Sequence, residues 1–307
     1  MSTQISERIS LGASDLRISP LGMGTNAWGF SGRADPEKQP TLEAALDGGI
    51  NFIDTAEIYN LGGSEKTLGL LLQESRADVV LATKFFPYPW RFTKSSLTAA
   101  LGASLKRLKV PNVDLYILHF PVPPVPLKAW VEALADVHRV GLTRAVGISN
   151  CTPAQTRLAH AVLAGKGIPL ASNQVEYSLL NRSAERNGLL ATCKELGVTL
   201  VAYRPLGYGL LTGKYKPENL PATLHGRLIT RTDLRRVSPL LELMGELART
   251  HDKTLSQVAL NWILCKGAVP IPGAKNPRQA AENAGALGWR LEAAEVKLLD
   301  QASEPLS

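Results

Sequence analysis

Four polar residues of different chemistry stand at or just past the ends of short apolar runs. Asp54 and Tyr59 follow residues 50–53, Lys84 follows 78–83, and His119 follows 113–118. If these runs are successive strands of a parallel barrel, their carboxyl ends share one rim and the four side chains converge there. The sequence therefore predicts a carboxylate, a phenol, an amine and an imidazole in one site.

Such a quartet is suited to protonating a carbonyl oxygen. A lysine ammonium that a carboxylate keeps charged favours the phenolate, so we expect Lys84 and Asp54 to lower the pKa of Tyr59 from its usual value of about 10. The phenol would then be a usable proton donor near neutral pH, and His119 could orient the substrate oxygen. Another group would have to deliver hydride.

Each residue also has an ordinary structural interpretation. Taken alone, His119 would be a hydrogen-bonded rim residue, Asp54 a helix cap and Tyr59 a half-buried aromatic. Lys84 is harder to explain, because a charge directly after the apolar residues 79–82 needs a buried partner or a task. Lys84 could alternatively form a Schiff base, as in aldolases, although Asp54 would keep its amine protonated.

A regular alternation of strands and helices must position these residues. Eight alternating units predict an α/β protein, a (β/α)8 TIM barrel, in a single domain over residues 1–307. Strands are expected at 21–24, 51–54, 79–83, 113–118, 145–148, 171–174, 198–203 and 269–272. Helices are expected at 36–47, 64–73, 93–108, 127–139, 153–163, 184–196, 239–251, 256–265 and, as an extra C-terminal element, 291–302.

Several segments outside this alternation also carry signals. Residues 6–19 predict an N-terminal β-hairpin, and Thr93, Thr152 and Asn276 are typical of helix starts. The loops at 86–92 and 120–126 combine prolines with aromatic residues and should lie on the catalytic rim. The long segment 206–237, rich in Gly, Pro and Arg, is expected to be a functional loop.

Composition narrows the class of protein. The 34 Lys and Arg against 27 Asp and Glu give a formal charge of +7, but no basic run exceeds Arg235-Arg236, so nucleic-acid binding is not expected. The excess charge is either a solvated surface or a field that attracts a phosphorylated small molecule. Three cysteines, Cys151, Cys193 and Cys265, lack metal-site spacing, which predicts no metal and a reducing compartment. With no leader-like or membrane-length apolar segment, we expect a cytoplasmic protein.

The motifs of the chain, taken in order, resemble those of the aldo-keto reductase family. They are NFIDTAEIY at 51–59 with GSE at 63–65, ATK at 82–84, DLY with LH at 114–119, VGISN at 146–150, NQVEYS at 173–178, AY with PL and GLLTGKY at 202–215, and IPGAKNP with Gln279, Glu282 and Asn283 at 271–283. The resemblance covers nearly the whole chain. Trp90-Arg91 and residues 270–289 are most similar to bacterial relatives of plant plastid reductases, in the neighbourhood of pyridoxal reductases.

The resemblance implies a role for each member of the quartet. Tyr59 would be the general acid in reduction, Lys84 would tune its pKa, Asp54 would pair with the lysine, and His119 would orient the carbonyl. The implied hydride donor is a nicotinamide dinucleotide. The absence of a strand-linked G-x-G-x-x-G motif agrees with binding outside a Rossmann fold.

The resemblance also implies the cofactor site. The nicotinamide would stack on Tyr203, the pyrophosphate would lie under residues 206–214, and Lys275 beside a helix start would suit a ribose 2′-phosphate, so NADPH is favoured over NADH. The full expected set is Gly24, Thr25, Asp54, Ser149, Asn150, Gln174, Tyr203, Arg204, Pro205, Leu206, Gly209, Leu211, Lys214, Arg227, Gly273, Lys275, Gln279, Glu282 and Asn283.

The substrate site is expected to be partly aromatic. Its predicted lining is Trp28, Tyr59, Phe85, Trp90, His119 and Phe120, which is compatible with aromatic aldehydes, pyridoxal or small dicarbonyls. Three positions depart from the family pattern: Asn26 replaces a frequent aromatic residue, Arg204 a common serine and Phe120 a frequent tryptophan. The tail ending at Ser307 is short, which suggests an open pocket.

The sequence thus predicts an NADPH-dependent reductase that converts aldehydes and some ketones to alcohols. Its partners would be small carbonyl compounds, with no nucleic acid or membrane, and the chain would be a monomer or a weak homo-oligomer. A second hypothesis is a redox-sensing or partner-docking barrel that holds NADP and turns over slowly, although no docking surface or added domain is evident.

Overall fold

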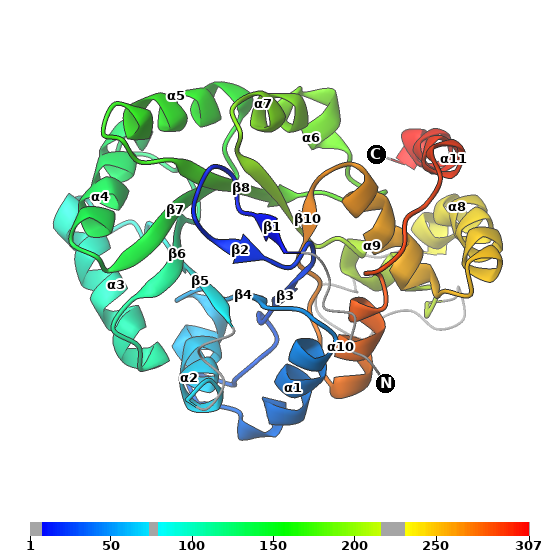
Figure 1. Ribbon diagram of the computed structural model, residues 1–307, viewed down its shortest axis with the longest axis horizontal. Helices are drawn as coiled ribbons and strands as arrows, with labels where there is room; N and C mark the ends of the chain where they lie inside the picture. The colour runs from blue at the N-terminus through cyan, green and yellow to red at the C-terminus, as the bar shows by residue number, and fades with distance from the viewer. Residues whose placement is uncertain (1–7, 74–78, 216–230, 307) are drawn as a thin grey trace.

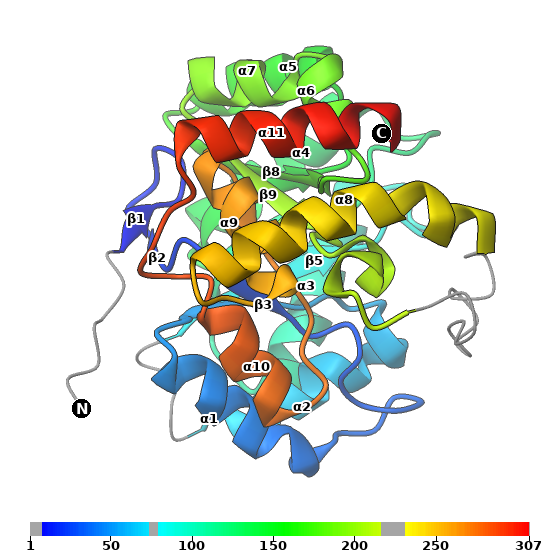
Figure 2. The same ribbon diagram turned by 90° about the vertical axis from the view of Figure 1, so that its right-hand side faces the viewer.

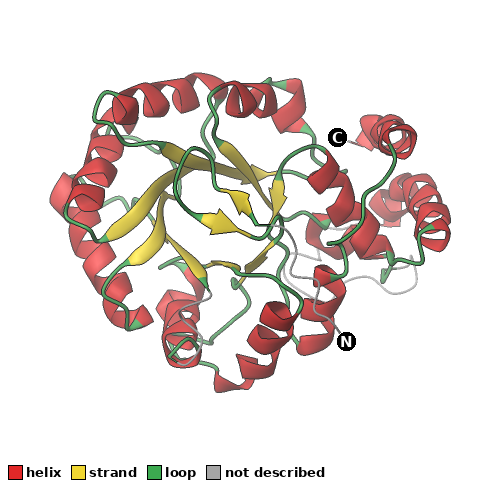
Figure 3. Ribbon diagram, in the orientation of Figure 1, coloured by secondary structure: helices red, strands yellow, loops and turns green. Residues whose placement is uncertain are grey.

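Eight parallel strands surrounded by helices form the body of the protein (Figures 1 and 3). The computed structural model describes residues 8–73, 79–215 and 231–306. The predicted (β/α)8 barrel is confirmed. Its strands are β3 Gly22–Gly24, β4 Phe52–Asp54, β5 Val80–Phe85, β6 Val113–Leu118, β7 Thr143–Ser149, β8 Leu170–Glu176, β9 Thr199–Tyr203 and β10 Val269–Pro270.

The barrel closes between its first and last strands. Each strand pairs with the next in sequence from β3 to β10. The Gly24 N–H donates to the Pro272 carbonyl at 3.0 Å, and Gly24 also bridges Gly273. Strand β10 is shorter than predicted because Pro270 and Pro272 have no N–H to donate to a ladder.

Helices cover the outside of the sheet, and α8 Arg231–Thr250 and α11 Ala293–Ser303 lie side by side and pack on α9 Leu255–Cys265 (Figure 2). None of the described helices is long and apolar enough to cross a membrane. The predicted caps at Thr93, Thr152 and Asn276 accept N–H bonds at the starts of α3, α5 and α10. The helices are α1 Gln39–Asp47, α2 Gly63–Leu71, α3 Lys94–Leu108, α4 Leu127–Arg139, α5 Pro153–Ala164, α6 Ser183–Arg186, α7 Leu189–Glu195, α8 Arg231–Thr250, α9 Leu255–Cys265, α10 Pro277–Ala284 and α11 Ala293–Ser303.

Two helix predictions were wrong in their bounds. The single helix expected at 184–196 is two, because Gly188 adopts φ 78°, in the left-handed region, and a right-handed helix cannot pass through it. Helix α8 begins at Arg231, whereas the sequence suggested Pro239, a residue that lies inside it. The segment expected to be a long loop is thus helical from 231 onward.

The N-terminal hairpin, β1 Ile9–Ser10 and β2 Arg17–Ile18, lies across the barrel axis (Figure 1). Its apolar residues Leu11, Leu16 and Ile18 are fully buried against the inner residues of the barrel, including Phe52 and Val80 near the strand starts. Because the hairpin fills this end, the site can only open at the opposite end, where the strands finish.

Alternation along the strands separates the barrel interior from the layer under the helices. On β5, Val80 and Ala82 belong to the inner cluster, whereas Leu81 and Phe85 belong to the outer one. Successive side chains of a strand point to opposite faces. Lys84 therefore points inward, near the open end of the barrel.

Candidate active site

The four predicted catalytic side chains converge at the carboxyl ends of β4, β5 and β6. The Lys84 ammonium lies 2.5 Å from Asp54 Oδ1 and donates to the Thr55 carbonyl at 2.7 Å and to Tyr59 Oη at 3.4 Å. The rings of Tyr59 and His119 meet edge to face with their centroids 6.0 Å apart. One lysine thus links the carboxylate to the phenol, with the imidazole beside them.

A strained turn carries Tyr59. It begins the short 3₁₀ helix η2, Tyr59–Gly62, in which Asn60 and Leu61 adopt φ values of 49° and 55°. Such left-handed conformations persist in residues other than glycine only where surrounding contacts hold them. Here the Asn60 side chain donates to the carbonyls of Asn26 and Trp28, both at 2.9 Å. These bonds fix the phenol over the lysine.

Lys84 is fully buried and charged. Burial is the largest single effect and lowers the pKa of its ammonium, but Asp54 and, to a smaller extent, Tyr59 together exceed it, so the pKa is raised. The second carboxylate oxygen of Asp54, Oδ2, accepts a hydrogen bond from Gln174 Nε2 at 2.9 Å. The site therefore contains a permanent ammonium next to the phenol.

The expectation of a lowered tyrosine pKa was wrong. Burial raises the pKa of Tyr59 and Asp54 adds to the rise, and together they exceed the opposing attraction of Lys84 for the phenolate. The sequence identified the charges but not the extent of burial. The phenol is consequently a protonated donor throughout the neutral range.

His119 is nearly buried, with 9% of its surface exposed. Burial, and secondarily the Lys84 charge, lowers the pKa of its imidazole to about 3. Among the described residues its Nδ1 has no hydrogen-bond partner. A neutral imidazole in this position can donate a hydrogen bond to a substrate oxygen but cannot act as the acid near neutral pH.

These pKa values predict a flat pH dependence for carbonyl reduction. Between about pH 5 and pH 9 the imidazole stays neutral, since its pKa is about 3, and the phenol stays protonated, since burial raises its pKa from the usual value. We expect kcat/KM for an aldehyde to show no inflection near pH 6.5 in buffers of constant ionic strength. A limb at pH 6–7 that disappears in His119→Asn would contradict the neutral imidazole.

The residues expected to hold the nicotinamide form one hydrogen-bonded group. Tyr203 Oη donates to Asn150 Oδ1 at 2.9 Å, and Asn150 Nδ2 donates to the His119 carbonyl at 3.0 Å. Ser149 Oγ donates to the Gln174 carbonyl at 2.7 Å. The half-buried phenol ring and these amides therefore adjoin the quartet, which suits a flat ring bearing a carboxamide.

The segment after β9 contains Arg204 and the 3₁₀ helix η4, Gly207–Thr212. Arg204, at φ 52°, lies over the rings of Tyr203 and Tyr208 and pairs with Glu176 at 3.0 Å. Leu211 is fully buried, so only its backbone could meet a cofactor. The other expected contacts in this segment are buried Pro205, partly buried Leu206 and Gly209, and exposed Lys214.

The residues expected at the adenosine end lie together around the start of α10. Lys275 is exposed, and its N–H donates to the Gln279 side chain at 2.8 Å. Asn283 donates to the Gly273 carbonyl at 3.3 Å, whereas Glu282 accepts a bond from Thr254 at 3.0 Å. Arg227 lies outside the described residues.

Gly24 and Thr25, both expected to contact the cofactor, stabilise the backbone next to Asp54. Gly24 closes the barrel through its bond to Pro272. The Thr25 hydroxyl is buried and bonds the Asp54 carbonyl at 2.9 Å and Ser64 at 2.8 Å. Both residues hold the strand end that presents the Asp54 carboxylate.

Two predicted substrate contacts, Phe85 and Trp28, were wrong. Phe85 is fully buried and packs on Trp130 of α4 with ring centroids 4.9 Å apart. Trp28 is also fully buried and donates from Nε1 to the Ala274 carbonyl at 2.8 Å. Neither side chain presents surface to a substrate.

Phe86, which the sequence reasoning missed, stands beside the quartet. Its ring meets those of His119 and Phe120 edge to face, at centroid separations of 5.7 Å and 5.9 Å. The sequence contained the information needed to find Phe86. If Lys84 points inward, strand alternation turns Phe85 outward and Phe86 inward. Trp90, by contrast, is 70% exposed and stacks on Tyr88 at the periphery.

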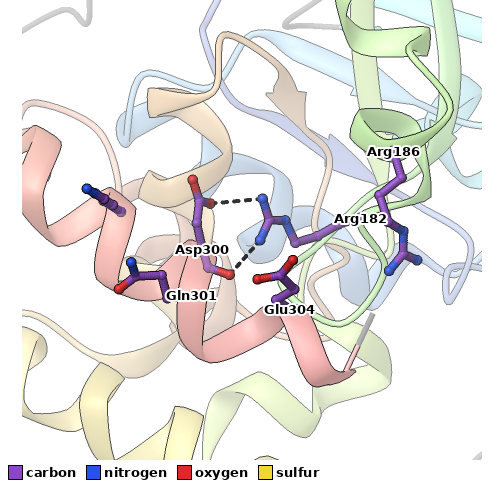
Figure 4. A pocket seen from close by; sticks show the side chains of 6 residues that line it. Arg182, Arg186, Asp300, Gln301 and Glu304 are labelled. Atoms are coloured by element: carbon purple, nitrogen blue, oxygen red, sulfur yellow. Dashed lines mark hydrogen bonds and ion pairs between the residues drawn. The ribbon is translucent and has the colours of Figure 1, made fainter.

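A separate depression of about 200 Å³ lies on the outer surface, between α6 and α11 (Figure 4). Its lining is mostly charged, and Arg182 pairs there with Glu185 and Asp300. None of the expected site residues lines this depression. It is therefore distinct from the rim where the quartet lies.

Comparison with known proteins agrees with this geometry. The model of the aldo/keto reductase family matches residues 20–304. A chloroplastic pyridoxal reductase of Arabidopsis thaliana is 41% identical over 309 residues, covering 94% of this chain and 84% of the relative. The chain belongs to the aldo/keto reductase family.

Solved structures show the same likeness. A glycerol dehydrogenase from Gluconobacter oxydans superimposes with a TM-score of 0.86 at 27% identity, covering 98% of this chain and 95% of that one. An aldo-keto reductase from Klebsiella pneumoniae, solved in complex with NADPH, gives a TM-score of 0.77 at 26% identity, covering 97% and 95%. Both likenesses extend over nearly the whole barrel.

Proposed function

We propose that this protein reduces aldehydes and some ketones to alcohols with NADPH, using Tyr59 as the general acid. The observation that carries the proposal is the buried Lys84 ammonium, which contacts Asp54 at 2.5 Å and Tyr59 Oη at 3.4 Å beside a neutral His119. The family membership and the NADPH-bound neighbour from Klebsiella pneumoniae support the same activity.

The quartet divides the work of protonating a carbonyl oxygen. Tyr59 gives its proton to the oxygen as negative charge develops there, and the Lys84 ammonium stabilises the phenolate that remains. Asp54 keeps that ammonium charged. His119 donates a hydrogen bond to the same oxygen and so fixes its position against the phenol.

The groups around Tyr203 suit the nicotinamide half of the cofactor. When bound, NADPH supplies hydride to the carbonyl carbon. Tyr203 would face the ring, while Ser149, Asn150 and Gln174 would hold the carboxamide. Arg204, Lys214 and Lys275 are the cations suited to its phosphates.

The Schiff-base alternative for Lys84 is disfavoured by the same contacts. A lysine nucleophile must be a neutral amine, so its pKa has to be lowered. Here the pKa of Lys84 is raised despite complete burial, because Asp54 accepts from the ammonium. The geometry favours acid chemistry over imine formation.

The proposal is tested by NADPH oxidation, followed by absorbance, with benzaldehyde, pyridoxal and methylglyoxal. We expect turnover with at least one aldehyde, and a higher kcat/KM with NADPH than with NADH. Lys275→Met should raise the KM for NADPH about tenfold and leave that for NADH unchanged, because only NADPH carries the 2′-phosphate. Lys297→Met, which removes an exposed lysine from the outer helix α11, serves as the matched control. Absence of NADPH oxidation with every carbonyl would contradict the proposed function.

A further inference from the structure

A part-buried ion pair outside the quartet, between Glu57 and Arg91, joins the Tyr59 turn to the loop after β5. Glu57 lies two residues before Tyr59 and is 9% exposed. Its Oε1 and Oε2 accept hydrogen bonds from Arg91 Nη1 and Nη2 at 2.5 Å and 3.0 Å. The planar guanidinium thus binds the carboxylate through two parallel hydrogen bonds, which fix both the orientation of the two groups and the distance between them.

The same two side chains hold the backbone of Phe86. The Phe86 N–H donates to Glu57 Oε1 at 2.7 Å, and Arg91 Nη1 donates to the Phe86 carbonyl at 2.7 Å. The guanidinium also lies over the rings of Phe85 and Tyr88, 5.1 Å and 5.0 Å from their centroids. Both polar groups of the Phe86 backbone therefore bond to the pair, and the carbonyl also accepts from the Tyr88 N–H at 2.9 Å.

Phe86 begins an aromatic wall beside the quartet, which we define as Phe86, Tyr88 and Phe120. The Phe86 ring lies 4.7 Å from that of Tyr88, 5.9 Å from Phe120 and 5.7 Å from His119. Of the three, Phe86 and Phe120 contact the imidazole ring. The direction of the Phe86 ring against His119 follows from its backbone, whose N–H is held by Glu57 and whose carbonyl is held by Arg91 and by the Tyr88 N–H.

A lysine or an apolar residue at position 91 could not do the same. Lysine carries a point charge and cannot bind both carboxylate oxygens and a carbonyl in one plane. An apolar side chain would leave the Glu57 carboxylate buried with a single N–H partner, which favours rearrangement of the loop. The pair is therefore specific to an arginine at this position.

We infer that Glu57 and Arg91 are positioning residues that hold Phe86 against His119, and that they thereby set a preference for flat aromatic aldehydes over short aliphatic ones. The inference rests on the proposed reductase function and deepens it by naming a substrate class. A flat ring can pack against the fixed edge of Phe86, whereas a short alkyl chain offers little area for contact.

The test compares benzaldehyde with propanal as substrates of Arg91→Met. We expect the ratio of their kcat/KM values to fall at least tenfold, mainly through the KM for benzaldehyde, with the Kd for NADPH unchanged within twofold. Arg91→Lys should keep an intermediate ratio. Arg157→Met is the matched control, because Arg157 makes an equally bidentate pair with Glu195 on the exposed outer surface, and it should change nothing.

Two further variants separate positioning from general damage. Glu57→Gln keeps an acceptor for the Phe86 N–H but loses the charge, so it should lower the ratio less than Arg91→Met does. In a Phe86→Leu background Arg91→Met should have no further effect on the ratio. The effects of two substitutions are not additive when one residue acts through the other.

Equal losses for both aldehydes, or full additivity with Phe86→Leu, would overturn the inference. Turnover by the wild-type chain shows independently whether the proposed function holds.

Discussion

Replacing Tyr59 by phenylalanine is expected to lower the turnover of aldehydes by about 100-fold or more. The substitution removes the phenol hydroxyl, whose oxygen lies 3.4 Å from Lys84 Nζ, and keeps the ring that meets His119. The Kd for NADPH should stay within about twofold, because Tyr59 lies outside the groups that surround Tyr203. Single-turnover absorbance and a fluorescence titration measure the two quantities.

Tyr177→Phe is the matched control for this substitution. Tyr177 is buried and donates to Glu185 at 2.6 Å, so the change also deletes one buried phenol hydroxyl. It should leave turnover intact, since Tyr177 lies away from the quartet and packs on Trp262. Turnover of Tyr59→Phe close to that of the wild type would rule out Tyr59 as the acid.

Replacing Lys84 by methionine should affect both stability and activity. Asp54 would lose its cationic partner while staying buried, and breaking a buried pair in this way typically costs about 3–5 kcal/mol in the free energy of unfolding. Turnover should fall about 100-fold or more, because the phenolate left after proton transfer would have no cation to stabilise it. Chemical denaturation and steady-state kinetics measure the two effects.

The double variant Asp54→Asn with Lys84→Met separates these effects. Without the buried carboxylate, much of the lost stability should return, because an apolar or neutral pair can replace a buried ion pair at little cost. Turnover should not return. If the double variant regained activity together with stability, Lys84 would be a structural residue only.

The parts of this protein that follow local periodicity were predictable from sequence. The alternation of strands and helices, the helix caps at Thr93, Thr152 and Asn276, and the inward position of Lys84 depend on residues close in the chain. The convergence of Asp54, Tyr59, Lys84 and His119 then followed from the geometry of a parallel barrel. Phe85 was assigned to the substrate site because the inward–outward alternation of side chains was not followed beyond residue 83, where the predicted strand ends.

Burial and distant pairing were not predictable in this way. The pKa of Tyr59 depends on the balance between desolvation and the Lys84 charge, and the sequence reveals only the charge. The pair of Glu57 and Arg91 joins loops 34 positions apart and takes shape only once both loops have folded. Trp28 was predicted to line the substrate pocket, but it is fully buried and donates to the Ala274 carbonyl, which lies far along the chain.

Transfer of deuterium to benzaldehyde from NADPH that carries deuterium at both C4 positions tests the central claim most directly. The wild-type chain should produce benzyl alcohol that carries deuterium at the former carbonyl carbon, over many turnovers, as measured by mass spectrometry of the alcohol. Unlabelled alcohol, or a yield limited to one equivalent per chain with the cofactor retained, would contradict a turning-over reductase and would favour a slow, redox-sensing barrel.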